Sequence, residues 1–278
     1  MTIDSDSPLI VALDYSCAAD ALTMADQLDP KLTRVKVGKE LFTAAGPHLI
    51  EALHERGFEI FLDLKFHDIP NTVMGAVKAA ANLGVWMVNV HASGGGRMME
   101  AAREGVEQSQ HKPELIAVTI LTSMQQSDLT ELDLPGELTE RVLGLASLAQ
   151  SSGMDGVVCS AHEASQIRRQ CGDTFSLITP GIRLAGDSAG DQRRVVTPTD
   201  AMAMGSNYLV MGRSITGSQQ PAETAKSILE SLNASSCGSV NPWIDLISRS
   251  PKRARYLVDR QYWRLIKEGG SPWESTII

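Results

Sequence analysis

The sequence predicts one (β/α)8 TIM barrel over residues 1–233, followed by a C-terminal extension over residues 234–278. Two observations support this α/β fold class. Eight short runs rich in Val, Ile and Leu alternate with helix-length segments, as in a parallel sheet buried on both faces. From Asp14, where the first run ends, to Arg213, just after the eighth, the average repeat is about 28 residues, which suits one strand and one helix. The alternative, an open doubly wound sheet, usually has fewer strands and a Gly-rich first turn, and no such turn follows Asp14.

The eight runs are predicted to be strands, in chain order. Each is short and mostly apolar, which is typical of strands in the centre of an α/β protein. They read PLIVALD (8–14), RVKV (34–37), EIFLDLK (59–65), MVNVH (87–91), LIAVTIL (115–121), GVVCS (156–160), LITPGI (177–182) and YLVMG (208–212).

The segments between these strands are rich in Ala and Leu and are predicted to form helices. They include 40–56, 72–83, 97–108, 138–151 and 162–170. One connection differs from this pattern. Residues 184–197, which follow the seventh strand, are small, polar and Gly-containing, and we expect them to form a mobile lid.

Composition narrows the function classes. The formal net charge of −8 argues against a general nucleic-acid or membrane-surface binder, so an anionic ligand would need a local concentration of positive charge. No run approaches the ~18 apolar residues of a membrane span, and the polar segment 1–7 does not resemble a signal peptide. The four cysteines lack C-x-x-C spacing, so neither a disulfide framework nor a zinc site is expected, and a cytoplasmic location is the default.

The extension differs from the barrel in composition. It carries seven Lys or Arg and four Asp or Glu, together with three of the four tryptophans. Leu257, Val258, Tyr262, Leu265 and Ile266 recur at helical spacing. This pattern predicts a helix that docks on the protein's own surface, with a partner-binding helix as the alternative.

In barrels of this class the chemistry lies at the carboxyl ends of the strands. Asp63 and Lys65 are two residues apart on the third strand, so both side chains are expected to face the barrel axis. Buried charges are costly unless they are paired, and Lys36 and Asp68 complete an alternating array. A lysine between two carboxylates is held protonated, so we expect Lys65 to donate a proton and not to act as a Schiff-base nucleophile. The alternative is structural: Asp68 caps the helix that opens at Pro70, and Lys65 forms an ordinary ion pair.

The ends of strands seven and eight predict a second feature, a phosphate site. Barrel enzymes often bind phosphate with the loops after these strands. Gly212 allows backbone N–H groups to approach an anion, and Arg183 and Arg213 bring positive charge. The alternative is that both arginines are solvated surface residues. Asp14, at the end of strand one, is expected to contact a ligand, although it could be a turn residue.

Three further patterns favour structural roles. Ser160 and Glu163 have the spacing of a helix capping box. His67 and His91 are expected to be hydrogen-bonded structural histidines. The glycines at 94–96 lack the Lys-Ser/Thr of a phosphate loop, so no ligand is assigned to them.

Taken together, these residues resemble a known family. The string DLKFHDIPNT at 63–72 is similar to the signature of orotidine 5′-phosphate decarboxylases of the bacterial type. The shorter strings ALD (12–14), KVGKE (36–40), LTS (121–123), PGIR (180–183) and MGR (211–213) occur in the family's order. The resemblance implies a TIM-barrel enzyme of de novo pyrimidine biosynthesis that converts orotidine 5′-phosphate to UMP and CO2 without a cofactor or a metal.

The resemblance also implies roles for particular residues. Lys65 is the general acid that protonates C6 of the pyrimidine, Asp63 lies near the departing carboxylate, and Lys36 and Asp68 complete the array. The implied substrate-binding residues are Asp14, Lys36, Asp63, Thr72, Thr122, Ser123, Pro180, Arg183, Gln192, Gly212 and Arg213. The family forms homodimers with shared active sites, in which Asp68 and Thr72 reach into the neighbour's site.

Two rival functions remain. Metal-dependent sugar-phosphate decarboxylases or synthases of the same superfamily share the D-x-K-x-x-D element but have an acidic metal ligand where Lys36 stands. A catalytically silent barrel that binds a nucleotide is the second rival. The extension after residue 233 is not required by the family's barrel, so the oligomeric state and any further partner stay open.

Overall fold

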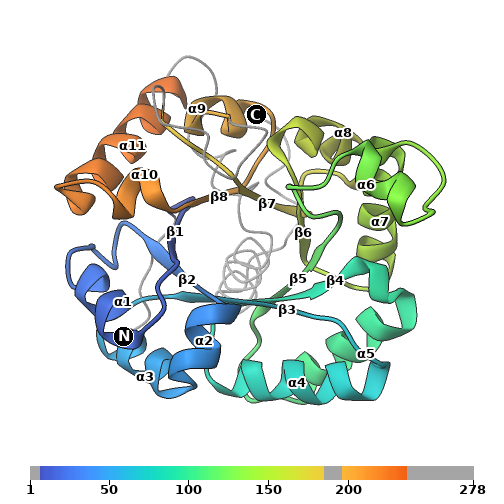
Figure 1. Ribbon diagram of the computed structural model, residues 1–278, viewed down its shortest axis with the longest axis horizontal. Helices are drawn as coiled ribbons and strands as arrows, with labels where there is room; N and C mark the ends of the chain where they lie inside the picture. Colours follow the sequence, from blue (N-terminus) through green and yellow to red (C-terminus); the bar gives the residue numbers. More distant parts are fainter. Residues whose placement is uncertain (1–6, 185–195, 237–278) are drawn as a thin grey trace, which may run out of the picture. The chain divides into compact units, whose positions relative to one another are not determined.

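The computed structural model describes residues 7–184 and 196–236. Eight parallel strands follow one another in chain order, and β8 pairs with β1 to close the ring (Figure 1). The predicted TIM barrel is therefore confirmed. The strands are β1 Leu9–Leu13, β2 Arg34–Gly38, β3 Ile60–Phe66, β4 Met87–His91, β5 Glu114–Val118, β6 Gly156–Val158, β7 Ser176–Pro180 and β8 Tyr208–Met211.

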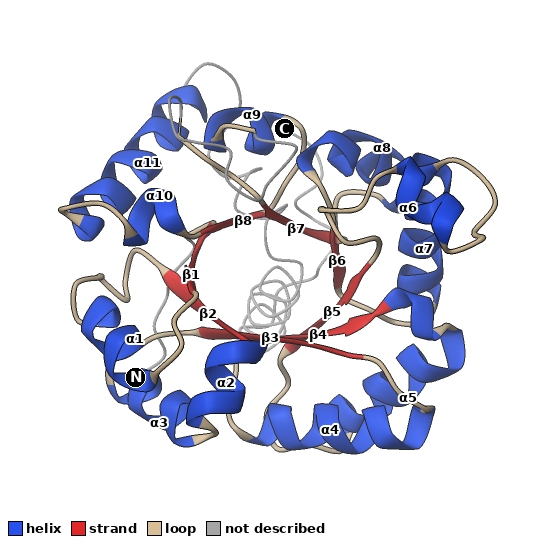
Figure 2. Ribbon diagram, in the orientation of Figure 1, coloured by secondary structure: helices blue, strands red, loops and turns tan. Residues whose placement is uncertain are grey.

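Helices surround the ring of strands on its outside (Figure 2). They are α1 Ala18–Ala25, α2 Lys39–Ala45, α3 His48–Glu55, α4 Pro70–Asn82, α5 Gly96–Glu107, α6 Gln126–Glu131, α7 Leu138–Ser151, α8 Ala161–Cys171, α9 Pro198–Ala203, α10 Arg213–Thr216 and α11 Pro221–Ser236, with a short 3-10 helix at Ala92–Gly94. The capping box predicted before α8 is present, since the Glu163 carboxylate accepts the backbone N–H of Ser160 at 3.0 Å.

The prediction of a single helix over 40–56 is wrong. Gly46, with φ of +67°, ends α2, and its N–H bonds back to the carbonyl of Phe42. Pro47 follows and begins α3 as its N-cap. Glycine tolerates the positive φ, and proline cannot donate the hydrogen bond that would continue α2. The connection between β2 and β3 therefore contains two helices.

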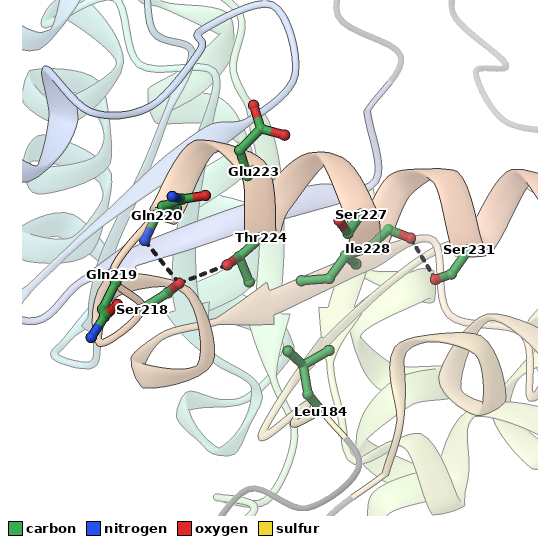
Figure 3. Close-up of a pocket in the computed structure, with 9 residues that line it drawn as sticks. All are labelled: Leu184, Ser218, Gln219, Gln220, Glu223, Thr224, Ser227, Ile228 and Ser231. Atoms are coloured by element: carbon green, nitrogen blue, oxygen red, sulfur yellow. Dashed lines mark hydrogen bonds between the residues drawn. The ribbon is translucent and has the colours of Figure 1, made fainter.

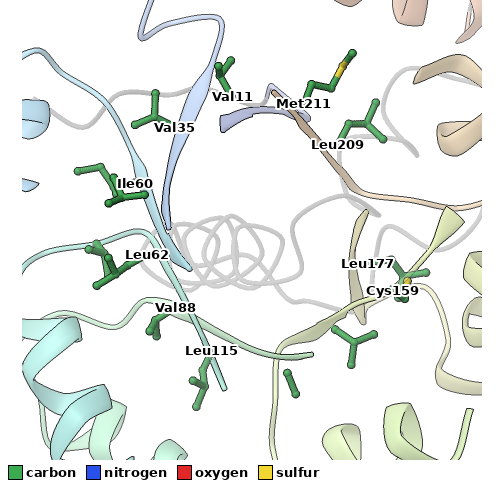
Figure 4. Packing of buried hydrophobic residues seen from close by; sticks show 14 of the residues in the cluster. Val11, Val35, Ile60, Leu62, Val88, Leu115, Cys159, Leu177, Leu209 and Met211 are labelled. Atoms are coloured by element: carbon green, nitrogen blue, oxygen red, sulfur yellow. The ribbon is translucent and has the colours of Figure 1, made fainter. Parts of the chain in front are cut away.

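The strands separate two layers of apolar side chains. Residues such as Val11, Leu62 and Leu209 point away from the ring axis toward the helices (Figure 4). The alternate residues fill the barrel interior, and this inner cluster comprises Ile10, Ala12, Phe61, Met87, Ile116, Val118, Val158, Ile178 and Val210. Because the interior is packed with apolar groups, the charged cavity described below lies at the mouth of the barrel.

A buried arginine closes the opposite end, at the amino ends of the strands. Arg34 donates to Glu59 at 2.7 Å, and its guanidinium carbon lies 4.2 Å from the ring centre of Trp86. Trp86 in turn contacts Tyr208 edge to face at 5.1 Å. This floor cluster, Arg34, Glu59, Trp86 and Tyr208, ties together the beginnings of β2, β3, β4 and β8.

The ladder between β3 and β4 is irregular near the carboxyl ends. Leu62 pairs with Val88, but the next pair is Phe66 with Val90. Three residues of β3 therefore stand opposite Asn89 alone, as in an extended β-bulge. Lys65 lies in this bulge with φ of +51°, in the left-handed region that lysine rarely adopts. The bulge therefore contains Asp63 and Lys65, the two charged residues of a strand that is otherwise apolar.

Two predicted segments lie wholly or mostly outside the described residues. Of the predicted lid over 184–197, only the ends are described. Ile182, just before it, and Val196, near its end, form a parallel β-bridge. Helix α11 runs to Ser236, past the predicted boundary at residue 233. The helix expected within 237–278 lies outside the described residues, so the role of the extension stays a prediction. None of the helices in the described part has the length and hydropathy needed to cross a bilayer.

Candidate active site

A cavity of about 700 Å³ opens at the carboxyl ends of the strands. Its walls come from most of the strands and from the loops that follow them, so distant parts of the sequence meet there. The lining residues are Ala12, Asp14, Lys36, Phe61, Asp63, Lys65, Thr122, Val158, Ile178, Pro180, Gly181, Arg183, Val210, Gly212 and Arg213. The location is the one predicted for the chemistry of this fold.

Four charged side chains form a continuous array on one wall. The ammonium of Lys65 lies 2.6 Å from one carboxylate oxygen of Asp63. The other oxygen of Asp63 lies 3.3 Å from the ammonium of Lys36, which is also 3.4 Å from Asp14. An alternating charge array at the mouth, expected from the spacing on β3, is therefore present.

The membership of the array differs from the prediction. Asp68 does not join it within the described chain, because β3 ends at Phe66 and the Asp68 side chain is exposed. Its carboxylate accepts the backbone N–H of Ile69 at 2.6 Å, and it does not cap α4, whose N-cap is Ile69. Lys65 thus contacts one aspartate and not two, and Lys36 is the lysine between two carboxylates.

Burial and pairing together set the charges of the central pair. Asp63 is 8% exposed and Lys36 is 9% exposed. Burial by itself raises the pKa of Asp63, but Lys36 and Lys65 outweigh it, and the net shift is downward. Burial likewise lowers the pKa of Lys36, and Asp63 with Asp14 reverses this to a net rise. Both residues are therefore ionised at neutral pH.

A half-buried histidine lies next to this array. Burial, followed by the nearby charges of His67, Lys39 and Lys65, lowers the pKa of His91 to about 4. The rings of His91 and His67 have centres 5.5 Å apart. His91 is therefore neutral at pH 7 and adds no charge to the site.

The loops after β7 and β8 add two positively charged side chains to the cavity. Arg183, which follows β7, is 7% exposed and lines the cavity, and among the described residues no carboxylate forms an ion pair with it. Arg213 begins α10 directly after Gly212. Among the described lining residues, Lys36, Lys65 and the two arginines give four cationic side chains against two carboxylates, a net +2 in a chain of −8. This local positive charge suits a ligand with negative groups.

The remaining candidates divide into three groups. Thr122 and Pro180 line the cavity as expected. Ser123 and Thr72 are exposed and do not line it. Gln192 lies outside the described residues. Sequence reasoning missed the apolar part of the lining, such as Phe61 and Ile178, although the alternation along each strand would have placed them inside.

A second cavity, of about 600 Å³, runs along α11 and reaches Leu184 (Figure 3). Among the described residues, its walls are mostly hydroxyl and amide side chains, with Leu184 and Ile228 as apolar members and Glu223 as the one ionisable member. Ser218 contacts Thr224 at 2.7 Å, so part of this polar surface is bonded to itself. The cavity contains none of the residues predicted to carry chemistry and no cation, and it is not the candidate active site.

The fold and the site together define a class: a parallel barrel that presents a lysine–aspartate array and two arginines to one cavity. A model of the family "Orotidine 5′-phosphate decarboxylase / HUMPS" matches residues 7–228. The chain belongs to this family.

Individual relatives agree with the family match. The chain is 59% identical over 232 residues to an orotidine 5′-phosphate decarboxylase of Alcanivorax borkumensis, covering 84% of this chain and all of that protein. It is 59% identical to that of Chromohalobacter salexigens over 82% of this chain and 97% of the relative. The crystal structure of orotidine 5′-phosphate decarboxylase from Lactobacillus acidophilus aligns with a TM-score of 0.74 and 39% identity, over 82% of this chain and 99% of that one.

Proposed function

We propose that this protein decarboxylates orotidine 5′-phosphate to UMP and CO2, the reaction named for its relatives, as a step of de novo pyrimidine biosynthesis. The observation that carries the proposal is the Lys65 ammonium, which lies 2.6 Å from Asp63 and lines a cavity of net positive charge. The reaction needs a proton donor at one carbon and anchors for a phosphate, and this cavity offers both. No cofactor is needed for these roles.

In the proposed binding mode the phosphate lies against Arg183, Arg213 and the backbone at Gly212. Asp14 and Lys36 bind the ribose hydroxyls, and Thr122, with Ser123 beside it, faces the base. This places C6 of the pyrimidine at the Lys65 end of the array. Remote contacts to the phosphate can then hold the reacting carbon in position, which is where binding energy assists the chemical step.

The proposed chemistry is a proton transfer to carbon. The C6–carboxylate bond breaks, CO2 leaves, and the electron pair of that bond stays at C6. The Lys65 ammonium donates its proton to this carbon, becomes a neutral amine, and takes a proton back from solvent. A fixed ammonium beside the developing negative charge is preorganised to stabilise it. Asp63 orients Lys65 and lies near the departing carboxylate.

We propose a homodimer in which the loop after β3 completes the neighbour's site. Asp68 and Thr72 are exposed in this chain, and Ile69 between them is 67% exposed, so this loop is accessible to a second subunit. In the dimer Asp68 of one subunit would approach Lys65 of the other, restoring the second carboxylate that the single chain lacks at Lys65.

Mixing two inactive variants tests the shared site. Lys65→Ala and Asp68→Asn homodimers should each be inactive, and subunit exchange should restore about a quarter of wild-type activity, because half of the dimers are mixed and each has one intact site. Mixing Lys65→Ala with Lys65→Ala/Asp68→Asn is the control and should restore none. Equal results in the two mixtures would contradict the shared site.

We also propose a cytoplasmic location. The three described cysteines, Cys17, Cys159 and Cys171, are free thiols, which suits a reducing compartment. Fractionation of cells that express the full chain tests this.

The decisive assay follows the absorbance of orotidine 5′-phosphate with no added metal. Turnover that persists after treatment with EDTA supports the proposal. Decarboxylation of a keto-sugar phosphate in place of orotidine 5′-phosphate would indicate the metal-dependent relatives. Binding of UMP without any absorbance change would indicate a silent nucleotide-binding barrel.

A further inference from the structure

Asn89 is a buried polar residue close to the charge array that does not itself line the cavity. It lies in the middle of β4, and its side chain is 0% exposed. Val88 and Val90 belong to the outer core and Met87 to the inner one, so strand alternation directs Asn89 into the barrel. A buried amide is costly unless both its oxygen and its NH2 group are hydrogen-bonded, so both ends of the Asn89 side chain need partners inside the barrel.

Both ends of the Asn89 amide bond to β3. The backbone N–H of Lys65 donates to its oxygen at 2.8 Å. Its NH2 group donates to Asp63 Oδ1 at 2.7 Å. Because a backbone N–H can only donate, the first bond fixes the orientation of the amide, and the NH2 group must face Asp63. One side chain therefore holds both members of the Lys65–Asp63 pair.

The bond to Lys65 compensates for the bulge in β3. Between the pairs Leu62–Val88 and Phe66–Val90 the backbone ladder is interrupted, and Asn89 stands opposite the interruption. Lys65 has φ of +51° there. Such a conformation persists only where the surroundings hold it. The amide oxygen of Asn89 gives the N–H of Lys65 the acceptor that a regular ladder would have supplied.

The bond to Asp63 fixes the carboxylate. Oδ1 accepts from Asn89 at 2.7 Å and from Lys65 Nζ at 2.6 Å, while Oδ2 faces Lys36 at 3.3 Å. With both oxygens engaged, the carboxylate cannot rotate without losing a partner. The ammonium of Lys65 is then tied at two points, through its backbone and through its ion pair, and both depend on Asn89.

We propose that Asn89 is a positioning residue that holds Lys65 and Asp63 in the geometry needed for proton transfer. The inference rests on the proposed decarboxylation, since it concerns how Lys65 is aimed at the reacting carbon. Asn89 touches no substrate in this scheme and acts only through the two charged residues.

The test compares Asn89→Leu, which removes both bonds at similar size, with Asn89→Asp. The aspartate keeps an acceptor for the N–H of Lys65 but places a carboxylate against Asp63 in place of the donor. For both variants kcat should fall about 100-fold or more, because small misplacements of a reacting group have effects of that size. KM and the inhibition constant of UMP should change less than about threefold, because Asn89 bonds to Lys65 and Asp63 and not to the arginines proposed to bind the phosphate.

Thr179→Val is the matched control. Thr179 is equally buried, shares a hydrogen bond of 2.7 Å with Ser206, and does not line the cavity. Loss of this hydrogen bond in Thr179→Val should lower the stability about as much as the Asn89 substitutions do, and should leave kcat and KM unchanged. A purely structural role for Asn89 predicts that its variants resemble this control once the folded fraction is taken into account.

The pH profile gives an independent readout. The groups that face Asp63 are Lys36 from β2, Lys65 from β3, and Asn89 and His91 from β4. Losing the amide donor raises the pKa of Asp63, so the acid limb of kcat should move to higher pH in Asn89→Leu and stay in place in Thr179→Val.

The outcomes separate this inference from the function it rests on. A wild-type protein that fails to decarboxylate orotidine 5′-phosphate overturns the proposed function. If the wild type is active and the Asn89 variants keep its kcat, only the positioning role is overturned. The same holds if Thr179→Val loses as much kcat as the Asn89 variants, or if the acid limb of the pH profile does not move in Asn89→Leu. If Asn89→Leu does not fold, the nearly isosteric Asn89→Asp decides the matter.

Discussion

At the scale of single residues, the two lysines of the site have different surroundings. Lys36 is buried between Asp14 and Asp63, and its pKa is raised, so its charge is fixed. Among the described residues, the Lys65 ammonium forms an ion pair only with Asp63, and its side chain is more exposed than that of Lys36. The lysine proposed to give up a proton is therefore the more exposed of the two.

Replacing Lys65 tests the proton donor. In Lys65→Ala, kcat should fall by at least roughly 10³-fold, within the range for loss of a general acid, while binding of UMP survives in part. Stopped assays with high enzyme concentration measure the residual rate. Lys78→Ala, which removes a lysine bonded to Gln108 on the outside of the barrel, should keep wild-type turnover. Wild-type turnover in Lys65→Ala would contradict the proposed mechanism.

Replacing Arg213 tests the phosphate wall. Arg213→Ala should raise KM for orotidine 5′-phosphate by about 10- to 100-fold, since a charged hydrogen bond to phosphate is lost. The effect on kcat/KM for orotidine, which has no phosphate, should be far smaller. Arg141→Ala, which removes an exposed hydrogen bond to the carbonyl of Pro135, is the control. An equal loss on both substrates would refute the phosphate role.

At the scale of elements, the ends of the barrel are built differently. At the carboxyl ends, the bulge in β3 brings Lys65 into the cavity at the expense of a regular ladder. At the amino ends, the floor cluster around Arg34 ties four strands together with an ion pair and two aromatic rings. The candidate active site lies at the irregular end, where enzymes of this fold carry their chemistry.

The floor cluster can be tested through stability alone. Arg34→Met should lower the free energy of unfolding by about 2–4 kcal/mol, because it removes a buried partner of Glu59 and the cation–π contact. Arg56→Met removes an exposed pair of the same 2.7 Å length with Asp26, and its effect on the free energy of unfolding should be much smaller because solvent screens the pair. Urea titrations of both variants give the comparison. Equal losses of stability in the two variants would show that burial of the Arg34 pair contributes nothing. Neither substitution should change kcat.

At the scale of the whole molecule, a strongly acidic chain concentrates positive charge in one cavity, and several buried groups make stability depend on pH. The neutral His91 has a pKa of about 4 when folded and about 6.5 when unfolded, so the unfolded chain binds more protons between these values. Stability is therefore full above pH 6.5 and falls as the pH drops toward 4. Asp63, whose pKa is lowered by folding, adds a further loss below its ordinary value of 3.8.

Urea unfolding at pH 7 and pH 4.5 checks this behaviour. The contribution of His91 should be about 1–2 kcal/mol after allowance for its partial exposure to solvent. His91→Asn should reduce the difference in the free energy of unfolding between the two pH values by that amount. His48→Asn, at an exposed histidine on α3, should leave the difference unchanged. An unaltered pH dependence in His91→Asn would contradict the assignment.

Truncation separates the barrel from the extension. Helix α11 belongs to the barrel, since Ala225, Ile228 and Leu232 are buried in its core. A chain ending at Ser236 should therefore remain folded and active, whereas one ending at residue 220 should lose both properties. Circular dichroism and the decarboxylation assay compare the two. Inactivity of the longer truncated chain would show that the extension is integral to the enzyme.

The sequence by itself determined the eight-stranded barrel and the location of its chemistry. Both follow from local patterns: apolar runs at a regular repeat, and charged residues directly after them. It also identified Lys65, Asp63, Lys36, Arg183 and Arg213 as residues of one site, because the carboxyl ends of parallel strands must meet.

Only the tertiary structure decided which charges touch. Within the described chain Asp14 and not Asp68 ends the array, because β3 ends at Phe66 and leaves Asp68 exposed, whereas Asp14 lies 3.4 Å from Lys36. The bulge at Lys65 and the amide of Asn89 that supports it also escaped prediction. Contacts between neighbouring strands depend on register and on backbone conformation, and spacing along a single strand encodes neither of these.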